Sequence, residues 1–162
     1  MASRHHVFIS HHHADDAHVT RLTDMLARAG HEIRNSSIRA KPANRQRLDR
    51  GLVSDRTIQR LLRMKMSWAS TVVVLIGKNT HTRPWVDWEI NKAKELGKRI
   101  VGVFERGGTE NDIPEPFKRY GDGLVAWNSD KIIGAIQGDC DPFENSGGGE
   151  REPVGTQPRN NC

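Results

Sequence analysis

Six consecutive β-branched or aliphatic residues, Thr71 to Ile76, run without a polar interruption and end at Gly77. A segment of this length and composition is typical of a strand buried on both faces, since successive side chains of a strand point to opposite sides. Such a strand needs helices above and below its sheet, which is the usual arrangement of a parallel sheet. The run therefore predicts the central strand of an α/β domain.

Strands and helices alternate along the rest of the chain. Apolar runs predict further strands at residues 7–10, 31–38, 100–104 and 124–127. Apolar residues at helical spacing predict helices that end at Gly30, surround residues 58–69, span residues 84–97 and begin at a capping Ser129. Residues 107–116 are interpreted as a long turn. Alternating strands and helices imply crossover connections, and therefore a parallel sheet covered on both faces.

The chain of 162 residues is long enough for one domain with a proper core. We expect that domain to span residues 1–138 and to include a basic connector, Arg39 to Val53. Residues 139–162 contain Gly, Ser and Pro with almost no apolar side chains, so we expect a disordered tail there.

The composition says more about the cellular compartment of the protein than about the molecule that it binds. A net charge of +5 suits a nucleic acid, an anionic small molecule or an ordinary surface equally well. The two cysteines, Cys140 and Cys162, lie toward the carboxyl end and cannot supply a disulfide framework, which suggests a reducing cytosol. No apolar run approaches 18 residues and the amino terminus lacks a signal-peptide core. We therefore expect a cytoplasmic protein with no membrane partner.

One acid lies where a helix should be apolar. If residues 84–97 are wound at about 100° per residue, Glu89 falls in the middle of an arc formed by Trp85, Val86, Ile90, Ala93 and Leu96. A carboxylate placed there must find partners or have a raised pKa, a condition that enzymes use. The alternative is a helix edge at which Glu89 reaches water or pairs with Lys92 or Arg83.

The carboxyl ends of the predicted strands select the residues around a ligand site. Ligands of open parallel sheets bind beyond these ends, where the strand order reverses. The rule selects residues 11–16, 35–39 and 78–85. Glu89 lies one turn into a helix that begins at the same edge.

Three segments together resemble the TIR (Toll/interleukin-1 receptor) domain, and more closely the TIR-like proteins of bacterial Thoeris antiphage defence systems. They are Val7-Phe8-Ile9-Ser10, the run from Val72 to Gly77, and Trp85-Val86-Asp87-Trp88-Glu89. The last resembles the Trp-x-x-x-Glu signature of NAD-cleaving TIR domains. The resemblance covers about residues 5–137.

This resemblance implies a flavodoxin-like fold of five parallel strands, with NAD⁺ as substrate and Glu89 as the catalytic residue. It also implies that nicotinamide leaves and that ADP-ribose, linear or cyclised, activates a partner effector protein. The chain departs from the family at His11-His12-His13 and in the connector of residues 39–53. We expect NAD⁺ to be bound as a substrate, with no separate cofactor. The sequence leaves open whether the chain forms a homo-oligomer.

Cleavage of the nicotinamide–ribose bond builds an oxocarbenium-like cation, which an anion near the ribose stabilises. Glu89 can supply that anion, either as a charge or as a nucleophile. Trp85 and Phe8 offer flat faces for the pyridinium or the ribose, with core packing as the alternative for both. The Ser10 hydroxyl can donate to the pyrophosphate. The expected substrate-binding residues are Phe8, Ser10, His11, Asn35, Ser36 and Trp85.

Other classes of function have less support in the sequence. The histidines near the amino terminus lack a set of cysteines or acids to complete a metal site, so none is expected. Phosphate-loop and nucleophile-elbow motifs do not occur. A phosphoacceptor receiver would need an Asp at the end of the central strand, but this strand ends in Leu75-Ile76-Gly77. Nucleic-acid binding has little support, because the basic connector contains no interleaved aromatic residues. The main alternative is a non-catalytic TIR-type scaffold that binds partners through its basic connector.

Overall fold

A computed structural model describes residues 3–11, 16–35, 55–138 and 141–154. The strands are β1 (Ser3–Ser10), β2 (His31–Asn35), β3 (Thr71–Ile76), β4 (Arg99–Phe104) and β5 (Gly123–Val125). The α-helices are α1 (Asp16–Arg28), α3 (Asp55–Ser67), α4 (Pro84–Glu95), α5 (Glu115–Tyr120) and α6 (Ser129–Gln137). Two short 3-10 helices, η2 (Thr80–Thr82) and η3 (Glu110–Asp112), follow β3 and β4.

The five strands form one parallel sheet in the order β2-β1-β3-β4-β5. This is the flavodoxin-like order, so the predicted fold class is confirmed. β3 is the central strand, as the apolar run predicted, and all six of its residues are buried. The order reverses between β1 and β3, which places the expected ligand crevice beyond Ser10 and Gly77.

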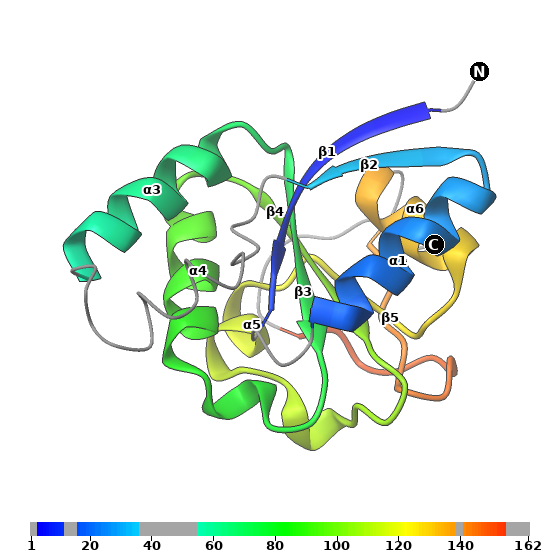
Figure 1. Cartoon of the computed structure of the whole chain (residues 1–162). Helices are drawn as coiled ribbons and strands as arrows, with labels where there is room; N and C mark the ends of the chain where they lie inside the picture. The colour runs from blue at the N-terminus through cyan, green and yellow to red at the C-terminus, as the bar shows by residue number, and fades with distance from the viewer. Residues whose placement is uncertain (1–2, 12–15, 36–54, 139–140, 155–162) are drawn as a thin grey trace.

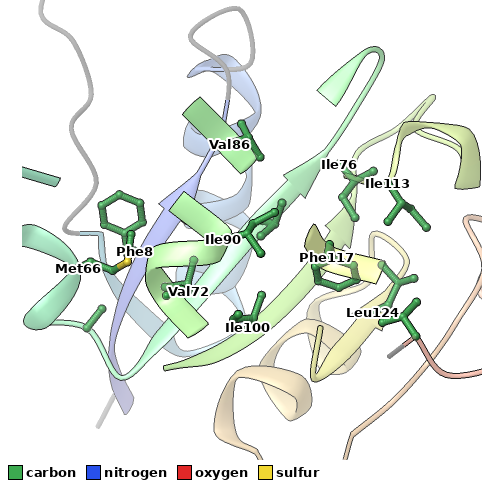
Figure 2. Packing of buried hydrophobic residues seen from close by; sticks show 14 of the residues in the cluster. Phe8, Met66, Val72, Ile76, Val86, Ile90, Ile100, Ile113, Phe117 and Leu124 are labelled. Carbon is green, nitrogen blue, oxygen red and sulfur yellow. The ribbon is translucent and has the colours of Figure 1, made fainter. Parts of the chain in front are cut away.

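Helices cover the sheet on both faces (Figure 1), as the alternation of strands and helices predicted. One face packs against α3, α4 and α5 and contains Phe8, Val72, Ile90, Ile100 and Phe117. Figure 2 shows part of this cluster, with Phe8 next to Met66 of α3. The other face packs against α1 and α6 and contains Ile9, Val73, Val101 and Ile132. Because successive strand residues alternate between these clusters, β1, β3, β4 and β5 each contribute to both halves of the core.

Helix α5 is absent from the sequence interpretation, which had assigned a long turn to residues 107–116. The helix has only six residues and carries Pro116 in its first turn, so it shows no helical periodicity. Its Phe117 fills a space beside Gly102 of β4, where a Cβ atom would lie 2.7 Å from the ring. Tertiary packing therefore holds this helix.

Smaller differences concern the ends of elements. β1 begins at Ser3 because it pairs with β2 from Ser3 onward, well before the apolar run at Val7. The cap of α6 is Asn128, whose side chain accepts a hydrogen bond from the Lys131 backbone N–H at 3.2 Å, so the prediction of Ser129 was wrong by one residue.

The segment of residues 141–154 packs against the domain, although the sequence interpretation placed it in a disordered tail. Phe143 pairs with Leu124 as an isolated parallel bridge and is buried in the same cluster as Phe117. One aromatic side chain thus anchors a Gly-rich and Pro-rich segment that composition alone describes poorly. Residues 155–162 and the whole basic connector lie outside the described residues, and the domain boundary at 138 stays a prediction.

In the described part of the chain, none of the helices combines the length and the apolarity required to span a bilayer.

Candidate functional site

Helix α4 carries Glu89 into the protein interior. The helix begins with Pro84, which suits the first turn because its missing N–H has no partner there. Glu89 is 6% exposed and lies among the buried residues Val86, Ile90 and Ala93 of the same helix. The predicted apolar arc is therefore confirmed around Glu89. Its edges differ, since Trp85 is 37% exposed and Leu96 is only partly buried.

Glu89 does not pair with Lys92, one of the two partners that the alternative interpretation offered. Lys92 binds Glu95 instead, with Nζ and Oε2 2.7 Å apart on the exposed side of the helix. The alternative of a Glu89 that reaches water at a helix edge also fails, because its side chain is enclosed. The carboxyl group of Glu89 is held instead by a residue of the sheet, Ser10.

The Ser10 hydroxyl donates a hydrogen bond of 2.8 Å to Oε1 of Glu89. Ser10 is the last residue of β1 and is fully buried. Its side chain lies on the same face of the sheet as Phe8, two residues earlier, and this is the face that α4 covers. The pair therefore joins the carboxyl end of β1 to α4, beside the point where the strand order reverses.

Burial raises the pKa of Glu89 to about 8, and the hydrogen bond from Ser10 opposes that rise. Desolvation dominates because one hydroxyl replaces only part of the water that a carboxylate loses. In the free protein the group is therefore mostly protonated at neutral pH. A cation bound next to it would favour the ionised form and lower its pKa.

Trp85 lies one turn before Glu89 on α4 and is partly open to solvent. Its ring meets Trp88 edge to face, with centroids 5.8 Å apart and planes at 72°. Trp88 packs against the core and supports Trp85 from one side. Trp85 is thus a partly open aromatic ring one helical turn from the buried acid.

The ring of Phe8 is fully buried in the core cluster and offers no open face to a ligand. Figure 2 shows it against Met66. The position of Phe8 agrees with core packing, the alternative to its predicted substrate-binding role. The physical reason is strand alternation, since Phe8 points under α3 and α4 while the exposed rim begins at His11.

The other predicted residues are placed to different degrees. His11 follows β1 directly and is half-buried, and its Nδ1 lies 3.0 Å from the Ile9 carbonyl oxygen. The Asn35 backbone ends β2 opposite Val7, at the same edge of the sheet. Ser36 lies outside the described residues, as do His12 and His13. Among the residues described, no three His, Cys, Asp or Glu side chains gather as metal ligands would.

Sequence reasoning missed a second buried acid at this edge. Glu105 directly follows β4, is 5% exposed, and has Oε2 3.7 Å from Nε2 of His18 in α1. The signal was present, since an acid that immediately follows a buried strand lies at the ligand-binding edge.

Comparison with known proteins identifies the family of this chain. The family model described as "Thoeris protein ThsB, TIR-like domain" matches residues 8–109. The chain belongs to this family. The matched range contains the end of β1 and all of β3, α4 and β4, and therefore includes Ser10, Glu89 and Glu105.

A relative among curated proteins is ThsB1 of Bacillus cereus (strain MSX-D12), whose name proposes cyclic ADP-D-ribose synthase activity. The two are 34% identical over 74 residues, which represent 42% of this chain and 38% of ThsB1. The match thus spans less than two-fifths of the relative.

One solved structure shows the same fold. A conserved protein from Enterococcus faecalis V583 aligns with 83% of this chain and 98% of its own, with a TM-score of 0.54 and 12% identity. The TIR domains of the activated Roq1 resistosome align with 62% of this chain and 57% of theirs, with a TM-score of 0.41 and 20% identity.

Proposed function

We propose that this protein cleaves the nicotinamide–ribose bond of NAD⁺ and forms an ADP-ribose product, linear or cyclic, that activates an effector protein in antiphage defence. Membership of the ThsB TIR-like family and the name of the relative ThsB1 support this proposal. The observation that carries it is the hydrogen bond between Ser10 and a buried Glu89 at the carboxyl edge of the sheet.

In the proposed reaction the bond between ribose C1″ and the pyridinium nitrogen breaks, and its electron pair goes to the nitrogen. Nicotinamide leaves as a neutral ring, and positive charge develops on the ribose. Glu89 stabilises that charge or traps it covalently. Water, or a nucleophilic atom of the ADP-ribose itself, then attacks C1″ and loses a proton. The first route gives ADP-ribose and the second gives a cyclic product.

The protonation state of Glu89 fits a cationic substrate. The free acid is mostly neutral at pH 7, because its pKa is about 8. The positively charged nicotinamide ring favours the carboxylate when it binds beside it. The site would thus become charged mainly when NAD⁺ occupies it.

The remaining roles follow from position. Trp85 offers a partly open aromatic face to the pyridinium. His11 and Asn35, at the carboxyl edge of the sheet, would bind the sugar and phosphates, together with Ser36, which lies outside the described residues, while Ser10 holds Glu89. We propose that the protein acts in the cytoplasm, and that copies of it can associate.

Release of nicotinamide tests this proposal. Purified protein, and lysates of infected cells that express it, are incubated with NAD⁺. The release of nicotinamide is followed by chromatography. We expect Glu89→Gln to abolish release. The matched control is Glu95→Gln, which removes an exposed acid from the same helix and should leave release intact. Equal release from the wild type and Glu89→Gln would contradict a role for Glu89. The absence of release in every condition would contradict the proposed enzymatic function.

A non-catalytic interaction module is the second candidate function. The exposed face of α3 and the turn after it favours this role, since it presents Leu61, Met64 and Trp68 to solvent, and Trp68 is 71% exposed. If this function is correct, Glu89→Gln should preserve protection against phage. Charge reversal at Arg45 and Arg47 of the basic connector should abolish it.

A further inference from the structure

A second set of side chains occupies the same edge of the sheet on the face opposite Glu89. Glu105 comes from the end of β4, His18 from the first turns of α1, and Trp127 from the segment after β5. Trp127 packs against the core cluster of α1 and α6, whereas Glu89 lies on the face covered by α3 and α4. The proposed mechanism uses none of these three residues.

The backbone holds Glu105 firmly at its place. Its N–H donates to the Ile76 carbonyl at 3.0 Å, which extends the pairing of β3 and β4, and its carbonyl accepts from Gly108 N–H at 2.9 Å. Gly77 leaves the space that the carboxylate fills, because a Cβ atom on Gly77 would lie 2.0 Å from Oε2 of Glu105. The sequence thus reserves a buried position for this acid at the carboxyl edge.

Glu105 supports His18, and His18 meets Trp127. Oε2 of Glu105 lies 3.7 Å from Nε2 of His18, so the buried carboxylate contacts the imidazole ring. The side chain of His18 is 24% exposed. Its ring meets Trp127 edge to face, with centroids 6.4 Å apart and planes at 81°. Two partly open rings nearly at a right angle thus form a corner, and one of them contacts a buried carboxylate.

Such a corner suits a flat heterocycle that carries an amino group. The base can stack on one ring while its edge meets the other, and a neutral imidazole has one acceptor nitrogen for a hydrogen bond from an exocyclic amine. Adenine has both properties.

The distance to Ser10 also suits a dinucleotide. β1 and β4 are separated by β3, so their tips are two strand spacings apart, about 10 Å. Ser10 pairs with Val74 and Glu105 lies three residues beyond that level, which adds about 10 Å along the strands. The two Cα atoms are therefore about 14 Å apart by these spacings. A ligand with two nucleotide halves can reach both sides of the sheet edge.

We propose that His18 and Trp127 bind the adenine base of the substrate, and that Glu105 is a positioning residue that orients His18. This subsite rests on the proposed function, because it takes NAD⁺ as the ligand. It assigns the two faces of the sheet edge to the two halves of one molecule, with the scissile bond near Glu89 and the adenylate beside α1.

Binding of AMP tests the subsite without any chemistry at Glu89. The dissociation constant of AMP is measured by calorimetry for the full chain and for His18→Ala, Trp127→Ala and Glu105→Gln. We expect the first two variants to weaken AMP binding by about tenfold or more, since stacking contributes most of the affinity for a base. Glu105→Gln should weaken it less. Trp68→Ala, which removes an exposed Trp after α3, is the matched control and should bind AMP like the wild type.

Kinetics with a truncated substrate separate binding from general damage. We expect the His18 and Trp127 variants to raise KM for NAD⁺ with little change in kcat, and to cleave nicotinamide mononucleotide, which lacks the adenylate, like the wild type. Equal losses on both substrates would overturn the proposal, and so would wild-type protein that fails to bind AMP at millimolar concentration. If AMP binds as expected but NAD⁺ is never cleaved, the subsite stands and the proposed function falls.

Discussion

Ser10 and Glu89 are 79 positions apart in the chain, yet the hydroxyl of one donates to the carboxyl group of the other at 2.8 Å inside the protein. The contact ties the tip of β1 to the helix that follows the central strand. It leaves an acid with a raised pKa in a dry setting, next to the crevice where parallel sheets bind ligands.

The first prediction concerns stability and pH. The folded state holds a proton on Glu89 up to about pH 8, whereas the unfolded chain releases it near 4.5. The contribution of this group to the unfolding free energy is therefore largest below pH 4.5, falls as pH rises toward 8, and then levels off. Glu89→Gln removes this slope and should be more stable than the wild type at pH 9, by an amount on the order of a few kcal/mol.

Denaturant unfolding at pH 5, 7 and 9 measures this difference. Glu95→Gln is the control, because Glu95 is exposed and should not reproduce the effect. A wild type and a Glu89→Gln variant whose stabilities run parallel from pH 5 to pH 9 would mean that Glu89 is not buried in solution.

The second prediction concerns Ser10. Its hydrogen bond lowers the pKa of Glu89 relative to burial alone, so Ser10→Ala should raise that pKa further. A hydrogen bond to a charged group contributes about 1.5–3 kcal/mol, which corresponds to about 1–2 pH units. The pH midpoint of kcat/KM should therefore move upward by about that amount. Ser70→Ala, which removes an exposed hydroxyl before β3, should leave the midpoint in place.

The third prediction concerns Trp85. If its ring holds the pyridinium, Trp85→Ala should raise KM for NAD⁺ by about 2- to 30-fold, the range that a cation–π contact of 0.5–2 kcal/mol allows. Steady-state kinetics with Trp68→Ala as the control measures this effect. The expectation fails if the variant of the more exposed Trp68 shows the same loss.

The fourth prediction separates packing from binding at Phe8. Phe8→Ala should lower the unfolding free energy by about 3–5 kcal/mol, because it opens a cavity in a buried cluster. Phe8→Leu fills most of that volume and should retain kcat/KM within a few-fold. A stably folded Phe8→Leu that has lost activity would restore a ligand-binding role to the ring.

The sequence predicted most of the fold because its signals are local. The apolar run of β3 and the helical spacing of α4 both depend on neighbouring residues, and the structure has both where they were expected. The burial of Glu89 followed from the same spacing. The partners of buried groups did not, since Ser10 reaches Glu89 only through the packing of α4 on β1.

Long-range packing explains the remaining differences. Phe117 makes α5 stable through Gly102 of a different element, and Phe143 anchors a segment whose composition suggests disorder. Glu105 and His18 meet across β4 and α1, which no spacing in the sequence relates. These contacts become visible only when the order of the strands is known.

The dependence of kcat/KM on pH tests the central claim most directly, because it reports the ionisation of the free protein. A buried Glu89 that acts as an anion predicts activity on NAD⁺ that rises through a midpoint near pH 8. The midpoint of kcat should be lower, since the bound pyridinium favours the carboxylate. A profile of kcat/KM that is flat from pH 5 to pH 9, or that falls as pH rises, would contradict the account.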